Sequence, residues 1–434
     1  MSNNKSIVRN RRSFLKNSGI ALIGSTLAYH SGISTPLGNA KKATLKVGLI
    51  GCGGRGTGAA LQAVQADPDA VLTAMGDVFE DRLNESYEEL MKEVKDKVKV
   101  DNQNKFVGFD AYLKVLQSGV DVVLLTTPPA FRPDHLIAAI DAGKHVFCEK
   151  PVAVDAPGVR KVLAAAKKAQ EKRLSLVSGF CLRYDSANRA IFGKVLNGDI
   201  GDIKTVSTFR NGGELWYKPR QPGWSNMTNQ MRNWYYYNWL SGDFLVEMAV
   251  HSLDMMSWAM GDKMPVRATG TGGRQVRVDD KYGNIYDHFA VEFEYAKGVK
   301  GFHFARQQDK TSSRNTVEIL GTNGTALINV GSNQEITGKE AWKYTGPKND
   351  MYQTEHDELF ASIRNGKPMN DGEWMANSTM IAILGRMVAY SGQTITWEQA
   401  LNSNEVLGPK TGDYSWDLTW NGPPIAKPGI TQFH

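Results

Sequence analysis

Cysteine, long apolar runs and net charge are all scarce in this chain of 434 residues, and each scarcity excludes a class of protein. The three cysteines, Cys52, Cys148 and Cys181, are odd in number and far apart, so we expect neither a disulfide framework nor a metal site. No run of about 18 apolar residues occurs beyond the N-terminus, which argues against a polytopic membrane protein. With 41% hydrophobic and 22% charged residues, the composition is that of a globular protein of two or three domains.

The net charge of +6 is concentrated in the first 40 residues. This segment contains no acidic residue and five basic ones: Lys5, Arg9, Arg11, Arg12 and Lys16. The rest of the chain is therefore nearly neutral. A nearly neutral protein attracts the phosphate backbone only weakly at long range, which argues against nucleic acid as a partner.

Residues 1–40 show the features of a twin-arginine signal peptide in the right order. Arg11 and Arg12 precede a weakly apolar stretch at 19–28, and small residues then lead to a cleavage site after Ala40. We expect export by this route to the periplasm, without a membrane anchor in the mature protein. Because the route carries folded proteins, a cofactor would be bound before export. The alternative is a basic amphipathic tail that happens to contain two arginines.

The first predicted element is a strand at 45–50 that runs into the glycine-rich turn GCGGRG at 51–56, before a helical pattern. In a dinucleotide-binding fold, Gly51 permits the tight turn, Gly53 lets the backbone approach the pyrophosphate, and Gly56 allows close packing of the helix. The pyrophosphate would lie at the helix N-terminus, where free N–H groups favour an anion. The alternative is a plain strand–helix turn.

Asp77 lies 21 residues past Gly56, at the end of a second predicted strand. An acidic residue at this place accepts hydrogen bonds from the hydroxyls of the adenosine ribose. Its carboxylate would repel a 2′-phosphate, so we expect NAD rather than NADP. A helix N-cap is the alternative role for Asp77.

Further strands are predicted at 120–126 and 145–148, and both end in short motifs. Ligands of parallel sheets bind beyond the carboxyl ends of the strands, so these motifs belong to the cofactor cleft. The candidate cofactor-binding residues are Gly51, Gly53, Gly54, Arg55, Gly56, Asp77, Thr126, Thr127, Pro128, Glu149 and Lys150.

Three side chains are candidates for proton transfer: Lys150, Glu247 and His251. A helix is predicted at 244–260. Glu247 and His251 are four positions apart and His251 and Asp254 are three apart, which would put the three side chains on one face of this helix. A carboxylate one turn from a histidine can orient the ring and raise its pKa, which would make His251 a general base. Lys150 would orient the substrate hydroxyl. The alternatives are a surface lysine and a buried histidine satisfied by its helix neighbours.

Residues 216–239 contain eight aromatic side chains in 24 positions, although aromatics make up only 9% of the chain. Aromatic rings interleaved with amides and cations suit a sugar, which has apolar C–H faces and a rim of hydroxyls. The alternative is a core or subunit-contact cluster. The candidate substrate-binding residues are Arg183, Tyr184, Trp224, Tyr236, Trp239, His251 and Asp254, with His303 as a further cleft candidate and His356 as a capping or interdomain residue.

These motifs together resemble the glucose–fructose oxidoreductase, inositol dehydrogenase and rhizopine-catabolism (Gfo/Idh/MocA) family, including its exported members. The shared features are GCGGRG, Asp77, TTPP at 126–129, EKP at 149–151, the helix with His251, and EILGTNGTALI at 318–328. The resemblance implies that Lys150 and His251 are catalytic, whereas Glu247 stands where the family usually has aspartate.

The resemblance also implies an N-terminal Rossmann domain, which we place at 41–180, and an α+β domain with a large, open, mostly antiparallel sheet at 181–434. The second domain would bind substrate and form a dimer or tetramer, and late helices are predicted at 352–364 and 373–389. Three functions remain open. The first is an NAD-dependent oxidoreductase that acts on a sugar, glycoside or polyol, at C3 of a sugar ring. The second is an NAD-dependent glycosidase or lyase that acts through a 3-keto sugar. The third is a non-catalytic sugar-binding protein.

Overall fold

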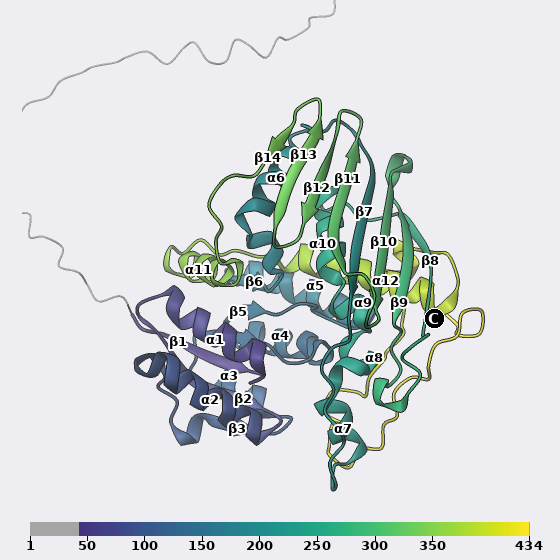
Figure 1. Ribbon diagram of the computed structural model, residues 1–434. Coiled ribbons are helices and arrows are strands. Elements are labelled where there is room, and N and C mark those ends of the chain that lie inside the picture. The colour runs from purple at the N-terminus through teal and green to yellow at the C-terminus, as the bar shows by residue number, and fades with distance from the viewer. Residues whose placement is uncertain (1–42, 434) are drawn as a thin grey trace, which may run out of the picture. The chain divides into compact units, whose positions relative to one another are not determined.

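The computed structural model describes residues 43–433 (Figure 1). The signal peptide predicted at 1–40 lies outside this range. Within residues 43–433, no helix is both long enough and apolar enough to cross a membrane.

The first third of the described chain forms a parallel sheet of six strands in the order β3-β2-β1-β4-β5-β6. This is the strand order of a dinucleotide-binding Rossmann fold, so the predicted fold is confirmed. The strands are β1 (Leu45–Ile50), β2 (Ala70–Asp77), β3 (Lys105–Val107), β4 (Val122–Leu125), β5 (His145–Cys148) and β6 (Leu176–Ser178).

Both faces of this sheet are covered by helices, which explains why its central strands are continuously apolar. On β4, Val122 and Leu124 belong to one core cluster, whereas Val123 and Leu125 belong to another on the opposite face. The helices between the strands are α1 (Gly54–Ala66), α2 (Glu80–Val94), α3 (Ala111–Gln117), α4 (Arg132–Asp141) and α5 (Ala156–Glu171).

The second sheet has nine strands in the order β14-β13-β12-β11-β7-β10-β9-β8-β15. All its neighbouring strands are antiparallel except β7 and β10, which confirms the predicted, mostly antiparallel sheet. Its strands are β7 (Ile203–Gly212), β8 (Arg267–Gly273), β9 (His288–Glu294), β10 (Lys300–Gln307), β11 (Arg314–Gly321), β12 (Gly324–Asn329), β13 (Asn333–Gly338), β14 (Trp342–Lys343) and β15 (Ile395–Thr396).

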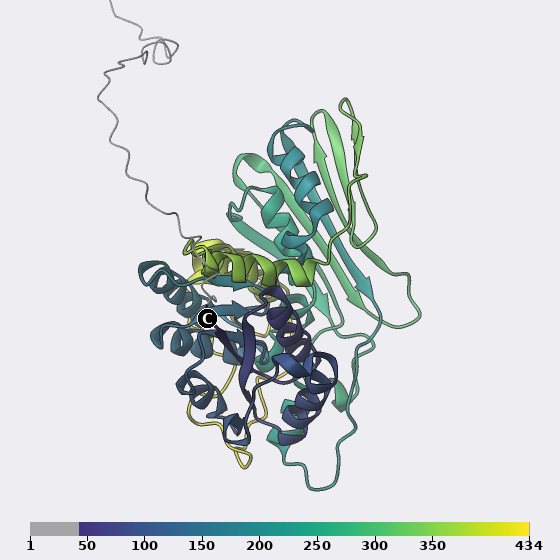
Figure 2. The same ribbon diagram turned by 90° about the vertical axis from the view of Figure 1, so that its left-hand side faces the viewer.

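Of two late helices, one packs on the first sheet and the other packs on elements of both sheets (Figure 2). α11 (Met351–Arg364) packs against α1, and α12 (Gly372–Ser391) packs against α5 as well as against β8 and β9. The helices predicted in this part of the chain are therefore present, although they cover elements of both sheets. The domain boundary drawn at residue 180 stays a prediction.

Burial of His303 on β10 predicts an acid-sensitive fold. Its side chain is fully buried with Nδ1 2.7 Å from the Thr208 hydroxyl, and burial lowers its pKa to about 3. The unfolded chain binds this proton near pH 6.5, so the free energy of unfolding falls by about 1.4 kcal/mol per pH unit below 6.5 from this residue alone. We expect the free energy of unfolding of His303→Gln, measured with urea, to fall less steeply between pH 7 and pH 5 than that of the unmodified protein. A slope equal to that of the unmodified protein would contradict this.

Candidate active site

The carboxyl ends of β1 and β4 lie side by side, since Ile50 pairs with Leu125 in the parallel register. The loops that follow these strands therefore meet at one edge of the sheet. A cavity of about 910 Å³ opens there. Nine of the predicted cofactor-binding residues line it: Gly51, Gly53, Gly54, Arg55, Gly56, Asp77, Thr126, Thr127 and Pro128.

The glycines of the turn differ in the space around them. Gly51 has φ +97°, which favours glycine. A Cβ on Gly56 would overlap the carbonyl oxygen of Gly51, whereas one on Gly53 would meet no atom within 4 Å. α1 also begins without a side-chain cap and without an acidic residue in its first turn. The free N–H groups of α1 and the open space at Gly53 fit the pyrophosphate of a dinucleotide.

Asp77 ends β2 at the wall of the cavity. Its Oδ2 accepts a hydrogen bond from the Cys52 N–H at 2.6 Å, and its Oδ1 accepts one from the Phe79 N–H at 2.9 Å. Burial raises its pKa, and the two backbone N–H groups oppose that rise. The residue that caps α2 is Phe79, so Asp77 is not the N-cap. Its remaining lone pairs can accept hydrogen bonds from ribose hydroxyls.

Sequence reasoning did not nominate several further side chains that line the cavity. Arg82, Lys218 and Arg232 bring positive charge, and burial together with the charges of Arg82 and Arg232 lowers the pKa of Lys218. Trp216 and Trp234, from the aromatic-rich segment, also line the cavity. The aromatic enrichment pointed to the segment, but the residues nominated from it were different ones.

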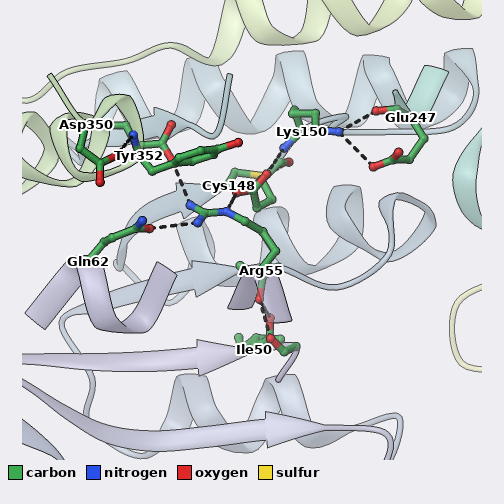
Figure 3. Close-up of polar contacts among 12 residues, drawn as sticks. Ile50, Arg55, Gln62, Cys148, Lys150, Glu247, Asp350 and Tyr352 are labelled. Atoms are coloured by element: carbon green, nitrogen blue, oxygen red, sulfur yellow. Dashed lines mark hydrogen bonds and ion pairs between the residues drawn. The ribbon is translucent and has the colours of Figure 1, made fainter. Parts of the chain in front are cut away.

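Arg55 connects the cavity wall to α11 (Figure 3). Its Nε lies 2.5 Å from Glu149 Oε1, and its Nη2 lies 3.0 Å from Glu355 Oε1. Glu355 is fully buried, and burial followed by the charge of Glu149 raises its pKa well above the usual range. The predicted cofactor residue Glu149 thus lies behind the cavity wall, where it holds Arg55 in place.

Lys150 points away from Arg55 toward Glu247 (Figure 3). Its Nζ donates to the carbonyl oxygen of Glu247 at 2.6 Å and to Glu247 Oε1 at 3.0 Å. The two side chains are 12% and 11% exposed, so this ion pair is largely shielded from solvent. The predicted catalytic residues Lys150 and Glu247 are therefore in direct contact, across 97 positions of sequence.

The expected single helix over 244–260 is broken. The chain forms α9 (Phe244–Glu247) and α10 (Val250–Ala259), with Met248 and Ala249 between them. Because of this break, Glu247 pairs with Lys150, and neither Glu247 nor Asp254 makes a hydrogen bond with His251 among the described residues. The prediction that the three side chains act together on one helix face is therefore wrong.

The expected rise in the pKa of His251 is also wrong. Burial lowers this pKa well below its ordinary value, and the charges of Lys150 and Arg210 lower it further. Its buried Nδ1 has no hydrogen-bond partner within the described residues. The imidazole is consequently neutral near pH 7, which is the form that can accept a proton.

Three of the predicted substrate-binding residues are held in internal networks. Arg183 Nη2 lies 2.8 Å from Oδ1 of Asp254, which is only 1% exposed and also accepts from Ser378 at 2.7 Å. The Tyr184 hydroxyl donates to Asp371 Oδ2 at 2.6 Å. Arg183, Tyr184 and Asp254 therefore hold elements together and line neither of the cavities described here.

Two of the three aromatic candidates are likewise structural in this arrangement. Tyr236 and Trp239 are fully buried, and their polar atoms bond to the carbonyl oxygen of Leu215 at 2.8 Å and to Gln230 Oε1 at 2.6 Å. Trp224 lies 5.7 Å from the Arg232 guanidinium. The core-cluster alternative thus describes Tyr236 and Trp239 better than sugar contact does.

A second cavity, of about 180 Å³, lies next to the catalytic candidates. Met248, from the break between α9 and α10, forms part of it, and so does Arg210, whose charge acts on His251. Its other lining residues are Gly212, Gly213, Glu214, Leu215 and Gln307. Sequence reasoning missed this cavity because its walls come from β7, β10 and the helix break.

Within residues 43–433, no group of three or more His, Cys, Asp or Glu side chains is placed to hold a metal ion. The buried side chains of His303 and His356 belong to no such group. His356 lies 4.2 Å from the Phe147 ring, ring centre to ring centre, and the cap of α11 is Asp350.

Comparison with known proteins identifies the family. The sequence model for the oxidoreductase family with an NAD-binding Rossmann fold (GFO_IDH_MocA) matches residues 45–176, and the model of the corresponding C-terminal domain matches 191–327. Myo-inositol 2-dehydrogenase of Thermotoga maritima is 26% identical over 337 residues, which cover 75% of this chain and 90% of that protein.

Solved structures show the same fold. An aldose-aldose oxidoreductase from Caulobacter crescentus superposes with a TM-score of 0.65 at 18% identity, covering 81% of this chain and 99% of that one. A levoglucosan dehydrogenase in complex with NADH and levoglucosan gives a TM-score of 0.64, with the same identity and coverage. At this identity the likeness establishes the fold alone.

Proposed function

The chain belongs to the Gfo/Idh/MocA oxidoreductase family, and we propose that it oxidises a secondary hydroxyl of a sugar, glycoside or polyol, with C3 of a sugar ring as the preferred position. One observation carries this proposal. The buried Nδ1 of His251 has no hydrogen-bond partner within the described residues and lies within the electrostatic reach of Lys150, which follows β5 of the sheet whose edge carries a cavity suited to a dinucleotide.

The cofactor, when bound, supplies the hydride acceptor, nicotinamide C4. The protein's own residues stabilise the substrate oxygen and accept the hydroxyl proton. Glu247 holds Lys150 Nζ in place, and the ammonium stabilises negative charge that develops on the substrate oxygen. His251 accepts the hydroxyl proton on a ring nitrogen. The small cavity at Arg210 and Met248 is the proposed place for the sugar or polyol.

We further propose NAD rather than NADP as the cofactor. In support, Asp77 lines the cavity at the end of β2, where an acidic residue of this fold accepts hydrogen bonds from the ribose hydroxyls. If the signal-like segment at 1–40 directs export to the periplasm, the cofactor has to stay bound through many turnovers. Retention on that scale requires nanomolar affinity, roughly −12 kcal/mol. A second substrate would then reoxidise it, and a homo-oligomer is the expected assembly.

The first test is to purify the full chain after expression through its own export route, denature it, and identify the released nucleotide by mass spectrometry. We expect about one NAD or NADH per chain. Addition of inositols, aldoses and glycosides to the native protein should then reduce the bound nucleotide, followed by absorbance. Released NADP would contradict the role given to Asp77. Protein that neither carries nor binds a dinucleotide would contradict the proposal as a whole.

The same screen separates the glycosidase alternative. Cleavage of a glycoside without net accumulation of reduced nucleotide would favour a 3-keto elimination mechanism over net oxidation.

Localisation is tested by fractionating cells that express the full chain and a variant with both Arg11 and Arg12 changed to Lys. We expect the unmodified protein in the periplasmic fraction and the variant inside the cell.

A further inference from the structure

The segment 411–420, here called the strap, alternates between exposed and half-buried residues from position 413 onward. Tyr414, Trp416, Leu418 and Trp420 are half-buried, and the residues between them are exposed. A period of two is that of an extended chain with one face turned inward. The strap, yellow in Figure 1, has neither helix nor strand, so side chains rather than a backbone ladder hold it in place.

The inward face of the strap crosses the carboxyl ends of several strands of the Rossmann sheet. The Trp416 ring centre lies 5.1 Å from that of Phe79, which follows β2, and 4.8 Å from that of Phe109, which follows β3. The Tyr414 ring centre lies 5.1 Å from that of Phe131, which follows β4. The strap therefore covers the edge at which the cofactor cavity opens.

Part of the strap is itself a wall of that cavity. Thr411, Gly412 and Tyr414 line it together with Asp77 and Thr126. Since the end of β2 is where this fold receives the adenosine ribose, the strap faces the adenosine half of the site. A flat aromatic lining of this kind suits a purine ring.

Hydrogen bonds attach the chain on either side of the strap, whereas aromatic contacts hold its middle. Before it, the Leu407 N–H donates to Asp155 Oδ2 at 3.2 Å. At its far end, the carbonyl oxygen of Trp420 accepts from Gln230 Nε2 at 2.5 Å. Between these two points, a strap side chain makes a hydrogen bond to the cleft at Thr411, whose hydroxyl donates to Asp134. Tyr414 and Trp416, between these points, are held by ring contacts rather than by hydrogen bonds to the cleft.

We propose that the strap is the outer wall of the adenosine half of the cofactor site and sets the rate at which the dinucleotide leaves. The proposal rests on the proposed function, because it requires a bound dinucleotide. Tyr414 and Thr411 face the ligand. Trp416 does not line the cavity, so it is a positioning residue that holds Tyr414 down by packing on Phe79 and Phe109.

The test measures the dissociation rate of NADH. Purified protein is loaded with NADH and mixed with a large excess of NAD⁺, and the decay of nicotinamide fluorescence gives the rate. We expect Trp416→Ala to raise this rate roughly 10- to 100-fold, as the loss of two aromatic contacts predicts. Trp416→Phe keeps an aromatic ring and should stay within about 3-fold of the unmodified protein.

Trp342→Ala is the matched control, because Trp342 is another half-buried tryptophan with a ring neighbour, on β14 of the other sheet. It should leave the rate unchanged. If Trp416→Ala does not fold, Thr411→Val removes the bond to Asp134 and should raise the rate several-fold. Amide exchange of residues 408–420 in the unmodified protein should also slow when NADH is added.

The outcomes separate this proposal from the proposed function. If NADH binds and leaves folded Trp416→Ala and Thr411→Val at the unmodified rate, the strap proposal is overturned while the dehydrogenase proposal stands. Unchanged amide exchange at 408–420 on NADH binding would also overturn it. If the unmodified protein binds no dinucleotide under any condition, the proposed function fails, and the strap proposal fails with it.

Discussion

Replacing Lys150 by Met should lower the rate of substrate oxidation about 10³-fold while the dinucleotide stays bound. The Lys150 ammonium is the positive charge that contacts Glu247 and lowers the pKa of His251, and methionine keeps the length of the side chain without that charge. The measurement is the single-turnover reduction of bound nucleotide by absorbance, with the retained nucleotide quantified by mass spectrometry. Loss of the nucleotide itself would show that Lys150 acts in binding instead.

Two further variants show whether the position of the ammonium matters. Lys168→Met removes a lysine that pairs with Asp141 at 2.5 Å on the surface, and it should leave the rate unchanged. Glu247→Gln should lower the rate by no more than about 10-fold, because Lys150 Nζ also donates to the main-chain oxygen of Glu247, which glutamine retains. A loss as large as that of Lys150→Met would mean that the carboxylate itself takes part in the chemistry.

The second large effect is expected from Gly56→Ala. The added Cβ would overlap the carbonyl oxygen of Gly51 and lie 2.6 Å from Thr126 Oγ1, so α1 would have to move away from the sheet. We expect a loss of about 3 kcal/mol in the free energy of unfolding. Dinucleotide binding should also be lost, since the N–H groups of α1 would no longer point at the pyrophosphate. Urea unfolding and mass spectrometry of the purified protein measure the two effects.

Gly193→Ala is the control for this variant. Gly193 lies within α6 (Ser186–Leu196), and a Cβ there would meet no atom within 4 Å. We expect a gain of about 0.5–1 kcal/mol, because alanine restricts the unfolded chain and fits a helix. If Gly56→Ala proved as stable as Gly193→Ala and still bound NADH, the close packing of α1 on the turn would not be needed for the site.

The dinucleotide-binding half could be predicted because its signals are local. A strand, a glycine-rich turn and a helix follow one another within about 20 residues. The turn contains Gly51, Gly53 and Gly56, and at each of these positions this fold favours a residue without a side chain. Continuous apolar strands such as 120–126 also report burial on both faces directly. The sequence by itself therefore determined the fold class and the place of the cofactor cleft.

Only the tertiary structure decided which side chains meet. The pairing of Lys150 with Glu247 spans 97 positions, and periodicity assigned Glu247 to His251 because it could not reveal the break after α9. The aromatic segment was recognised, but tertiary packing decides which of its rings face the cavity: Trp216 and Trp234 line it, whereas Trp239 is buried and stacks on Tyr414 of the strap. Burial and charges from distant segments, rather than sequence neighbours, set the protonation state of His251.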